Sequence, residues 1–324
     1  MKNRAGLMAV GLLATLLFSS WGFFAHRRIN RMAVFTLPAK PGAFYKAHID
    51  EITEHAVDPD KRRYVSKTEA PRHYLDADHY GKSPFDSIPH KWEDAKKKYS
   101  EDTLRAYGIV PWAIQSTYQK LVSAFKERDS SKIIRFSSDL GHYVADAHVP
   151  LHMSLNYNGQ LTGQTGIHAF WESRLPELFA DQYNYFAGRA EYLDDPLEAA
   201  WGICRRTFST VDSTLRFEKE LNASFPADKK YTFQNRNNKV IKEYSPEYSK
   251  AYHDMLNGMV ERQMRLSIKM VGSFWYSAWV DAGQPDLKNM GTKPLSAQEK
   301  TELRAEEKAY RKGKAIGRPE GDDK

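Results

Sequence analysis

The chain has 324 residues, of which 41% are hydrophobic and 13% are aromatic. This is enough apolar material for one large core, so the composition excludes a protein that is disordered throughout. The formal net charge of +7 is mildly basic, and it favours a polyanionic ligand only weakly because the basic residues are scattered. The single cysteine, Cys204, excludes an intramolecular disulfide.

The N-terminus has the residue order of a secretory signal. Two basic residues precede the apolar run Ala5–Phe18, and Ser19 and Ser20 follow it. The run is shorter than the roughly 20 residues that a membrane-spanning helix needs. We therefore expect residues 1–20 to be removed on export, with a short uncleaved anchor as the alternative. The mature protein would be periplasmic or secreted, without stable insertion in the membrane.

The rest of the sequence predicts an all-α fold. Apolar residues recur with helical spacing in four segments, Pro111–Phe125, Ile133–Ala147, His168–Phe179 and Met255–Val280. Patterns typical of strands are scarce. We expect one multi-helix domain over residues 21–286, with long irregular loops between helices, of which Val57–Pro89 and Asn156–Gly166 are the clearest.

Residues 287–324 are charged and poor in large apolar side chains. They predict a C-terminal tail that is helical at Ala297–Arg311 and otherwise disordered. We expect the protein to be a monomer.

The sharpest chemical pattern lies between His142 and His152. Residues four apart share one face of a helix, so His142 and Asp146 can hold the same metal ion. Pro150 ends that helix, which lets His152 turn toward a different position. Taken alone, the segment could equally be a solvated helix face with scattered histidines.

Further candidate ligands flank this segment. His168 and Glu172 are again four residues apart, at the start of an amphipathic helix. In the loop upstream, Asp58 and His73 are plausible ligands, although ordinary turn chemistry explains aspartates there equally well. Two His/carboxylate pairs joined by a glycine-bearing loop are hard to explain as surface decoration.

The expected cleavage adds a ligand at the mature N-terminus. A free α-amine titrates near pH 8, so a metal can displace its proton at neutral pH. The amine and carbonyl oxygen of Trp21 could chelate an ion, with His26 about one helical turn later. Without cleavage after Ser20 this site would not exist.

Taken in order, these motifs resemble the superfamily of bacterial zinc-dependent phospholipase C and the fungal and plant single-strand-specific zinc nucleases. The resemblance covers Trp21 to Leu178. It is carried by Trp-Gly-x-x-x-His from Trp21, an aspartate before His73-Tyr74-x-Asp76, His-x-x-x-Asp-x-His-x-Pro-Leu-His from His142, and Gly-x-His-x-x-x-Glu from Gly166.

The resemblance implies three zinc ions in a cleft of a helical domain. One ion would be held by Asp58, His73, His142 and Asp146. Asp146 would bridge to a second ion, held by Trp21 and His26. The third ion would be held by His152, His168 and Glu172. Asp60 competes with Asp58, which we prefer because its distance from His73 in the sequence suits the nuclease branch. His148 belongs to the motif as support for the ligands.

The resemblance also implies a reaction and residues for the substrate. A hydroxide between the ions bridged by Asp146 would attack phosphorus, with Asp58 and Asp146 as the catalytic carboxylates. Tyr74 would stack on a base and Asp76 would hydrogen-bond to it, although Tyr74 could equally be a core aromatic. Arg72 would contact phosphate or pair with a nearby aspartate.

The substrate class follows from details of these motifs. The short spacing from Trp21 to His26 and the form of the segment ending at His152 favour a single-strand nuclease or 3'-nucleotidase, with single-stranded nucleic acid or nucleotides as substrate. Glu172, where the nucleases typically have aspartate, and the compact loop before His168 favour the alternative, a phospholipase C acting on phospholipid. A zinc-binding module without turnover is a third reading.

Overall fold

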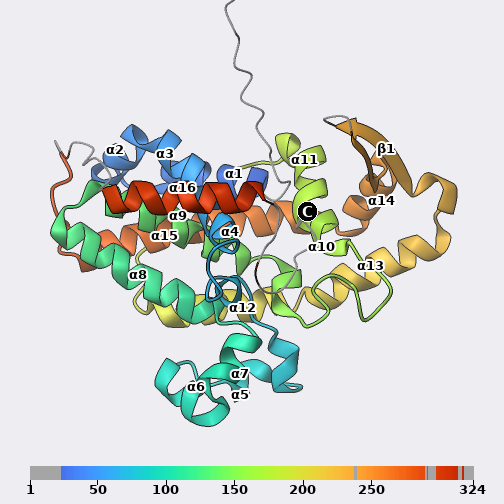
Figure 1. The fold of residues 1–324 in the computed structure, drawn as a ribbon, viewed down its shortest axis with the longest axis horizontal. Helices are drawn as coiled ribbons and strands as arrows, with labels where there is room; N and C mark the ends of the chain where they lie inside the picture. The colour runs from blue at the N-terminus through green and yellow to red at the C-terminus, as the bar shows by residue number, and fades with distance from the viewer. Residues whose placement is uncertain (1–22, 237–238, 289, 291–296, 313–315, 317–324) are drawn as a thin grey trace, which may run out of the picture.

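The computed structural model describes residues 23–236, 239–288, 290, 297–312 and 316, and most of them are helical (Figure 1). The α-helices are α1 (Phe23–Ala33), α2 (Ala39–Ala47), α3 (Ile49–Glu54), α4 (Asp58–Arg62), α5 (Pro84–Ser87), α6 (Trp92–Tyr99), α7 (Glu101–Ala106), α8 (Val110–Glu127), α9 (Ser130–Asp146), α10 (Ile167–Ala169), α11 (Leu175–Phe179), α12 (Pro196–Phe208), α13 (Val211–Ser224), α14 (Pro246–Met255), α15 (Met259–Asp281) and α16 (Ala297–Arg311). Two strands, β1 (Tyr231–Arg236) and β2 (Lys239–Tyr244), form one antiparallel hairpin. The expectation of a helical fold is confirmed.

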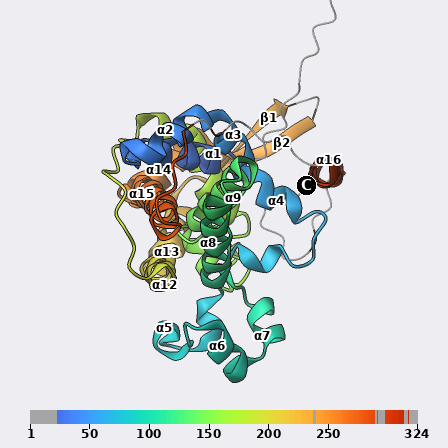
Figure 2. The same ribbon diagram turned by 90° about the vertical axis from the view of Figure 1, so that its left-hand side faces the viewer.

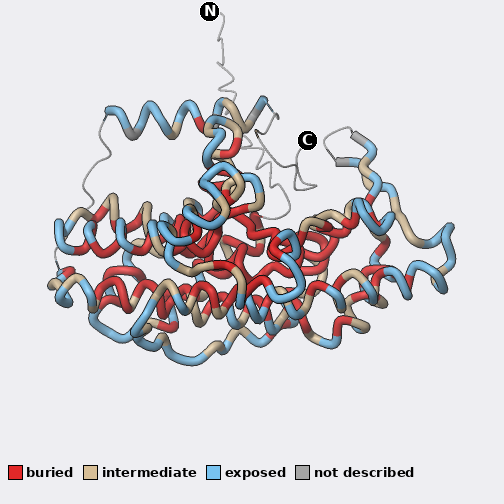
Figure 3. Tube along the Cα trace, turned by 90° about the horizontal axis from the view of Figure 1, so that it is seen from below, coloured by how far each residue is buried: buried red, intermediate tan, exposed pale blue. Residues whose placement is uncertain are grey.

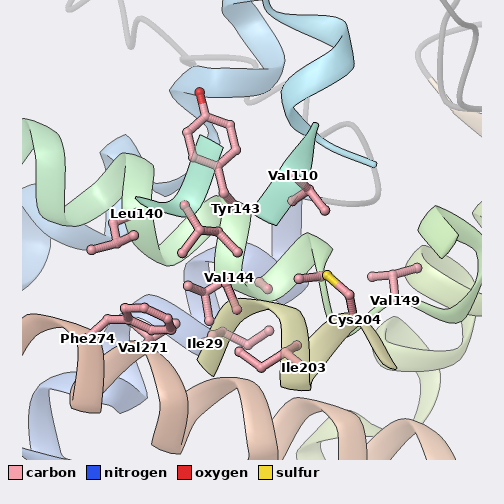
Figure 4. Packing of buried hydrophobic residues seen from close by; sticks show 14 of the residues in the cluster. Ile29, Val110, Leu140, Tyr143, Val144, Val149, Ile203, Cys204, Val271 and Phe274 are labelled. Atoms are coloured by element: carbon pink, nitrogen blue, oxygen red, sulfur yellow. The ribbon is translucent and has the colours of Figure 1, made fainter. Parts of the chain in front are cut away.

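Helix α9 lies at the centre of the molecule, where it packs against α1, α8 and α15. Its side chain Val144 lies among Ile29 of α1, Val271 and Phe274 of α15, and Ile203 of α12, all of them buried (Figure 4). Apolar burial of this extent is the main source of stability in a helical protein. The last turns of α9, which carry His142 and Asp146, are therefore held in a fixed place.

Local sequence explains where the two central helices end and begin. Helix α8 ends at Glu127, and the next residue, Arg128, has a left-handed backbone conformation with φ 53°. The Asp129 side chain then accepts a hydrogen bond from the backbone N–H of Lys132 and caps α9. This tight turn sets α8 beside α9, and both helices occur where the apolar spacing predicts them.

A glycine allows α1 to approach α9 next to the first histidine of the metal motif. A Cβ atom built on Gly141 would lie 2.1 Å from Oδ1 of Asn30, which is far inside van der Waals contact. Asn30 donates through Nδ2 to the carbonyl of Ser138, at 3.2 Å. The close approach brings the rings of His26 and His142 into a stack with centroids 4.0 Å apart.

Two of the expected continuous helices are interrupted. The segment His168–Phe179 consists of α10, a five-residue π-helical turn Phe170–Arg174, and α11. Pro176 explains the break, because it has no N–H to donate to the carbonyl of Glu172. The segment Met255–Val280 is divided between α14 and α15, because Asn257 and Gly258 both take positive φ angles.

The segment Val57–Pro89 is more ordered than an irregular loop. It begins with α4, whose second residue is the proline of an Asp-Pro pair, and it contains α5 and short 3₁₀ turns. Helices α5, α6 and α7 project together from the helical body (Figure 2). Proline fits the first turn of a helix, so the composition that suggested a loop is also compatible with a series of short helices.

The hairpin Tyr231–Tyr244 was missed by the helical expectation. Its strands pair from Tyr231 opposite Tyr244 to Arg236 opposite Lys239. A run of β-formers, Tyr-Thr-Phe and Val-Ile, on either side of an asparagine pair is the signal that predicts it in retrospect.

Helix α16 confirms the expected helix at Ala297–Arg311, and it contacts α4. Both α16 and the hairpin lie at the periphery; α16 is mostly exposed, and the described side chains of the hairpin are exposed or partly buried apart from Glu243 (Figure 3). The expected signal peptide, residues 1–20, and most of the tail outside α16 lie outside the described residues. Within the described part of the chain, no helix combines the length and hydropathy that crossing a membrane requires.

Candidate metal centre

The end of α9 places two candidate ligands at the middle of a buried polar cluster. His142 Nε2 lies 3.2 Å from Oδ2 of Asp146, one helical turn away. The other oxygen of Asp146, Oδ1, lies 3.4 Å from Nε2 of His26 on α1. Asp146 is almost fully buried, and its two oxygens therefore face ligands from different sides.

A first ligand group joins the turn after α4 to α9. His73 Nδ1 lies 3.1 Å from Nε2 of His142 and 3.0 Å from Oδ2 of Asp146. Oδ1 of Asp60 completes the group, at 3.7 Å from His73 Nδ1 and 3.5 Å from His142 Nε2. The ligand atoms of Asp60, His73 and His142 are close enough to share one metal ion, and so are those of His26, His142 and Asp146.

Asp58 lies elsewhere, and this corrects our preference for it over Asp60. Its carboxylate accepts hydrogen bonds from His55 Nδ1 at 2.6 Å and from Lys61 Nζ at 3.3 Å. The reason is the helical form of α4, in which residues two apart point to different sides. Asp60 faces the histidines, and Asp58 forms an ion-pair network beside them.

A second ligand group combines His152, His168 and Glu172, as the motif predicts. Oε2 of Glu172 lies 2.9 Å from His168 Nε2 and 3.3 Å from His152 Nε2. His152 comes from the 3₁₀ turn Pro150–Met153 that follows α9, so the proline does redirect it. Glu172 lies within the π-helical turn that interrupts the expected helix.

His26 connects the two groups. Its Nε2 lies 3.4 Å from Oδ1 of Asp146 and 3.4 Å from Oε1 of Glu172. The polar atoms thus run without interruption from His73 and His142 through Asp146, His26 and Glu172 to His152 and His168. Trp21, the other expected ligand on this side, lies outside the described residues.

Backbone carbonyls fix the orientation of three of the histidines. His142 Nδ1 lies 2.8 Å from the carbonyl of Ala56, His152 Nδ1 lies 2.6 Å from that of His73, and His168 Nδ1 lies 3.2 Å from that of Tyr157. A carbonyl only accepts, so each ring carries its proton on Nδ1. In the neutral ring, Nε2 then presents a lone pair to the centre, as a metal ligand must.

The donor set fits a metal ion. Among the described residues, Oδ2 of Asp146 is a buried polar atom that faces the ligand histidines and makes no hydrogen bond. Buried polar atoms are rarely left unsatisfied. Burial works to raise the pKa of Asp60, yet the adjacent histidines, His142 first, lower it to about 2.

The same balance holds for the other two carboxylates. Burial favours their neutral form, but the pKa values of Asp146 and Glu172 remain well below the usual range because histidines surround both groups. All three carboxylates are therefore ionised at neutral pH. Imidazole and carboxylate ligands without cysteine suit zinc and other divalent transition metals.

A second layer of charge, not foreseen from the sequence, supports His73. Oε1 of Glu69 lies 3.6 Å from His73 Nε2, and Glu69 accepts a hydrogen bond from the hydroxyl of Tyr143. Arg62 lies 3.5 Å from Glu69 and 2.9 Å from Asp139. A carboxylate behind a ligand histidine orients the ring and raises its basicity. In the sequence, the one indication of this role is that Glu69 lies four residues before His73.

Arg72 and Tyr74, which we expected at the substrate, are engaged elsewhere. Arg72 donates to Thr117 Oγ1 at 2.9 Å and lies 4.7 Å from the ring centroid of Tyr143. The ring of Tyr74 is only 5% exposed and its hydroxyl donates to the carbonyl of Ala106. Tyr74 therefore occupies the core position that was its alternative. Asp76 is also buried, and its contact with a base remains a prediction.

His148 supports α9 itself. Its Nδ1 lies 2.7 Å from the carbonyl of Val144, and burial lowers the pKa of the ring to about 4. It is neutral at physiological pH and belongs to neither ligand group.

Comparison with known proteins adds no relative to this description, since no family model matches the chain and no curated protein is similar to it.

Proposed function

We propose that the protein is an exported zinc-dependent hydrolase of phosphate esters, acting on single-stranded nucleic acid or nucleotides as a nuclease or 3'-nucleotidase. The observation that carries this proposal is the position of Asp146. Its two oxygens face two different sets of histidines, as a carboxylate shared between two ions requires. The two oxygens of Glu172 likewise face different histidines, Oε1 facing His26 and Oε2 facing His168. Up to three ions can be accommodated by such an arrangement.

A catalytic role is favoured over a structural one by the type of ligand. Structural zinc sites are typically closed tetrahedra rich in cysteine. The one cysteine, Cys204, is buried, belongs to no ligand group, and has a pKa raised by burial. The candidate ligands are histidines and carboxylates drawn from four separate segments.

Bound zinc ions would supply Lewis acidity, an activated water and neutralisation of phosphate oxygens. The chain's own contribution is orientation and charge. The carbonyls of Ala56, His73 and Tyr157 hold the Nδ1 protons of three histidines. The carboxylates remain ionised at neutral pH, so the centre presents negative charge to bound cations. Burial works to lower the pKa of His142, but these carboxylates raise it well above its usual value, so a metal ion must displace the proton of that ring.

The test is metal content and turnover measured on the same preparation. The mature protein beginning at Trp21, reconstituted with zinc, is analysed for bound metal and assayed on oligothymidine, on a 3'-nucleotide and on phosphatidylcholine micelles. We expect turnover of the nucleotide substrates, loss of it in His142→Ala, and full activity in the control His90→Ala. His90 pairs with Glu198, away from the ligand groups.

Two other outcomes would contradict the proposed nuclease activity. Turnover of phosphatidylcholine alone would assign the site to a phospholipase C and contradict the nuclease reading. One tightly bound zinc ion without turnover would contradict the hydrolase and support the zinc-binding module.

A further inference from the structure

We infer that the β1–β2 hairpin is an arm that binds single-stranded nucleic acid beside the metal centre. This inference rests on the proposed function, because the arm would present the polymer to the same site. Figure 1 shows the hairpin projecting from the helical body near α11 and α14.

One face of the hairpin carries an exposed ring, two partly buried rings and an exposed lysine. The pairs Tyr231–Tyr244, Phe233–Lys242 and Asn235–Val240 lie on the same face, because alternate residues of a strand share a side. Phe233 is 67% exposed and Val240 is 72% exposed. The opposite face includes Glu243, which is buried and pairs with Arg174 at 3.4 Å.

The charge of the arm suits a polyanion. Lys242 lies on the same face as Phe233, and the single acidic residue of the two strands, Glu243, belongs to the opposite face. Lys242 Nζ lies 3.8 Å from the ring centroid of Tyr231. Aromatic side chains interleaved with cations are typical of surfaces on which bases stack while phosphates contact lysine or arginine.

The base of the arm packs against the segment that carries two candidate ligands, His168 and Glu172. The rings of Tyr231 and Tyr244 are 5.1 Å apart, and Tyr244 stacks on Phe170 with centroids 3.8 Å apart. Phe170 begins the π-helical turn that carries Glu172. A Cβ built on Gly166 would lie 3.7 Å from the Tyr244 hydroxyl, so the base of the arm lies over the helix start that bears a ligand histidine.

The distribution of side chains favours nucleic acid over a membrane surface. A membrane-inserting tip presents a contiguous apolar surface. Here the cross-strand neighbour of Phe233 is Lys242, and that of Val240 is Asn235. Polar and apolar side chains alternate across the face, which suits single bases and phosphates better than a lipid layer.

The experiment measures binding separately from hydrolysis. Full-length zinc-loaded protein is titrated against a fluorescent oligothymidine 20-mer with phosphorothioate linkages, which slow hydrolysis. Loss of one stacked base and one cation predicts at least about a tenfold weaker affinity for the double variant Phe233→Ala/Lys242→Ala, and a smaller salt dependence. Hydrolysis of a mononucleotide should be unchanged. The control is Phe35→Ala/Lys126→Ala, which removes an exposed phenylalanine and an exposed lysine elsewhere.

Each outcome decides between the readings. Equal affinity in the arm variant and the control would overturn the inference, whether or not the protein hydrolyses nucleotides. Loss of binding to phosphatidylglycerol vesicles with unchanged oligonucleotide affinity would overturn it in favour of a membrane contact. Weaker oligonucleotide binding without any hydrolysis in the parent protein would support the arm and contradict the nuclease.

Discussion

The hydroxyl of Tyr143 donates to the carboxylate of Glu69, and this contact ties the central helix α9 to the turn that carries His73. The ring of His73 is held between Glu69 on its Nε2 side and Asp146 on its Nδ1 side. The pKa of Glu69 is lowered despite its burial, because His73, Arg62 and Arg72 surround it. The candidate centre is thus supported by charges outside its ligand groups.

Glu69→Gln should therefore weaken zinc binding. The substitution keeps the size of the side chain but removes the charge behind His73, and loss of such a partner typically costs about 10–100-fold in metal affinity. Competition with a chromogenic chelator measures the effect. Glu93→Gln, an exposed glutamate on α6, is the control. Unchanged zinc affinity in a folded Glu69→Gln protein would show that Glu69 only stabilises the fold.

Asp60 and Asp58 should respond differently to the same change. Asp60→Asn removes a carboxylate 3.5 Å from His142 Nε2, so we expect one zinc ion fewer per chain and loss of hydrolysis. Asp58→Asn changes a group that pairs with His55 and Lys61 and should keep the full metal content. Mass spectrometry of the metal-loaded proteins measures both. The reverse pattern would restore Asp58 as the ligand.

The contrast between these two aspartates shows what the sequence could establish. His142 with Asp146, and His168 with Glu172, could be paired from sequence because a spacing of four has a defined meaning on a helix. Asp58 and Asp60 lie in a segment whose helical form was not evident, so the direction of each side chain was unknown. Glu69 also lies four residues before His73, but this spacing lies outside any helix evident from the sequence, so its place behind the ring depends on tertiary packing.

Gly141→Ala tests the close approach of α1 to α9. The added Cβ would collide with Asn30, forcing α1 and its His26 away from His142. We expect a loss of about 1–3 kcal/mol in the free energy of unfolding, as for other overpacked sites, together with weaker zinc binding. Urea denaturation and chelator competition measure the two effects.

The matched control is Gly202→Ala on α12. The nearest atom to a Cβ there is Arg206 Nη1 at 3.7 Å, which is ordinary contact. Replacing a mid-helix glycine by alanine without a clash should stabilise the protein by up to about 1 kcal/mol. If Gly141→Ala also stabilises it, α1 and α9 are not in the close contact that the stacking of His26 on His142 requires.

The docking of α16 should depend on pH through Glu306. This side chain is 8% exposed, and burial raises its pKa to about 7, with Asp58 and Asp139 adding to the rise while Arg62 and Arg135 oppose it.

When α16 is undocked, the carboxyl returns to its usual pKa near 4.5. The docked state therefore binds more protons between these two values, and its stability decreases as the pH rises through about 7. Hydrogen exchange of residues 297–311, corrected for the intrinsic rate, should show stronger protection at pH 6 than at pH 8.5.

Glu306→Gln provides the control, because a neutral amide keeps α16 docked over the whole range. Its protection should be independent of pH and should exceed that of the parent protein at both pH values, because the undocked carboxyl of the parent is already ionised at pH 6. Equal pH dependence in the two proteins would assign the effect to a group other than Glu306. Because α16 contacts α4, which bears Asp60, such undocking would also be expected to alter zinc affinity.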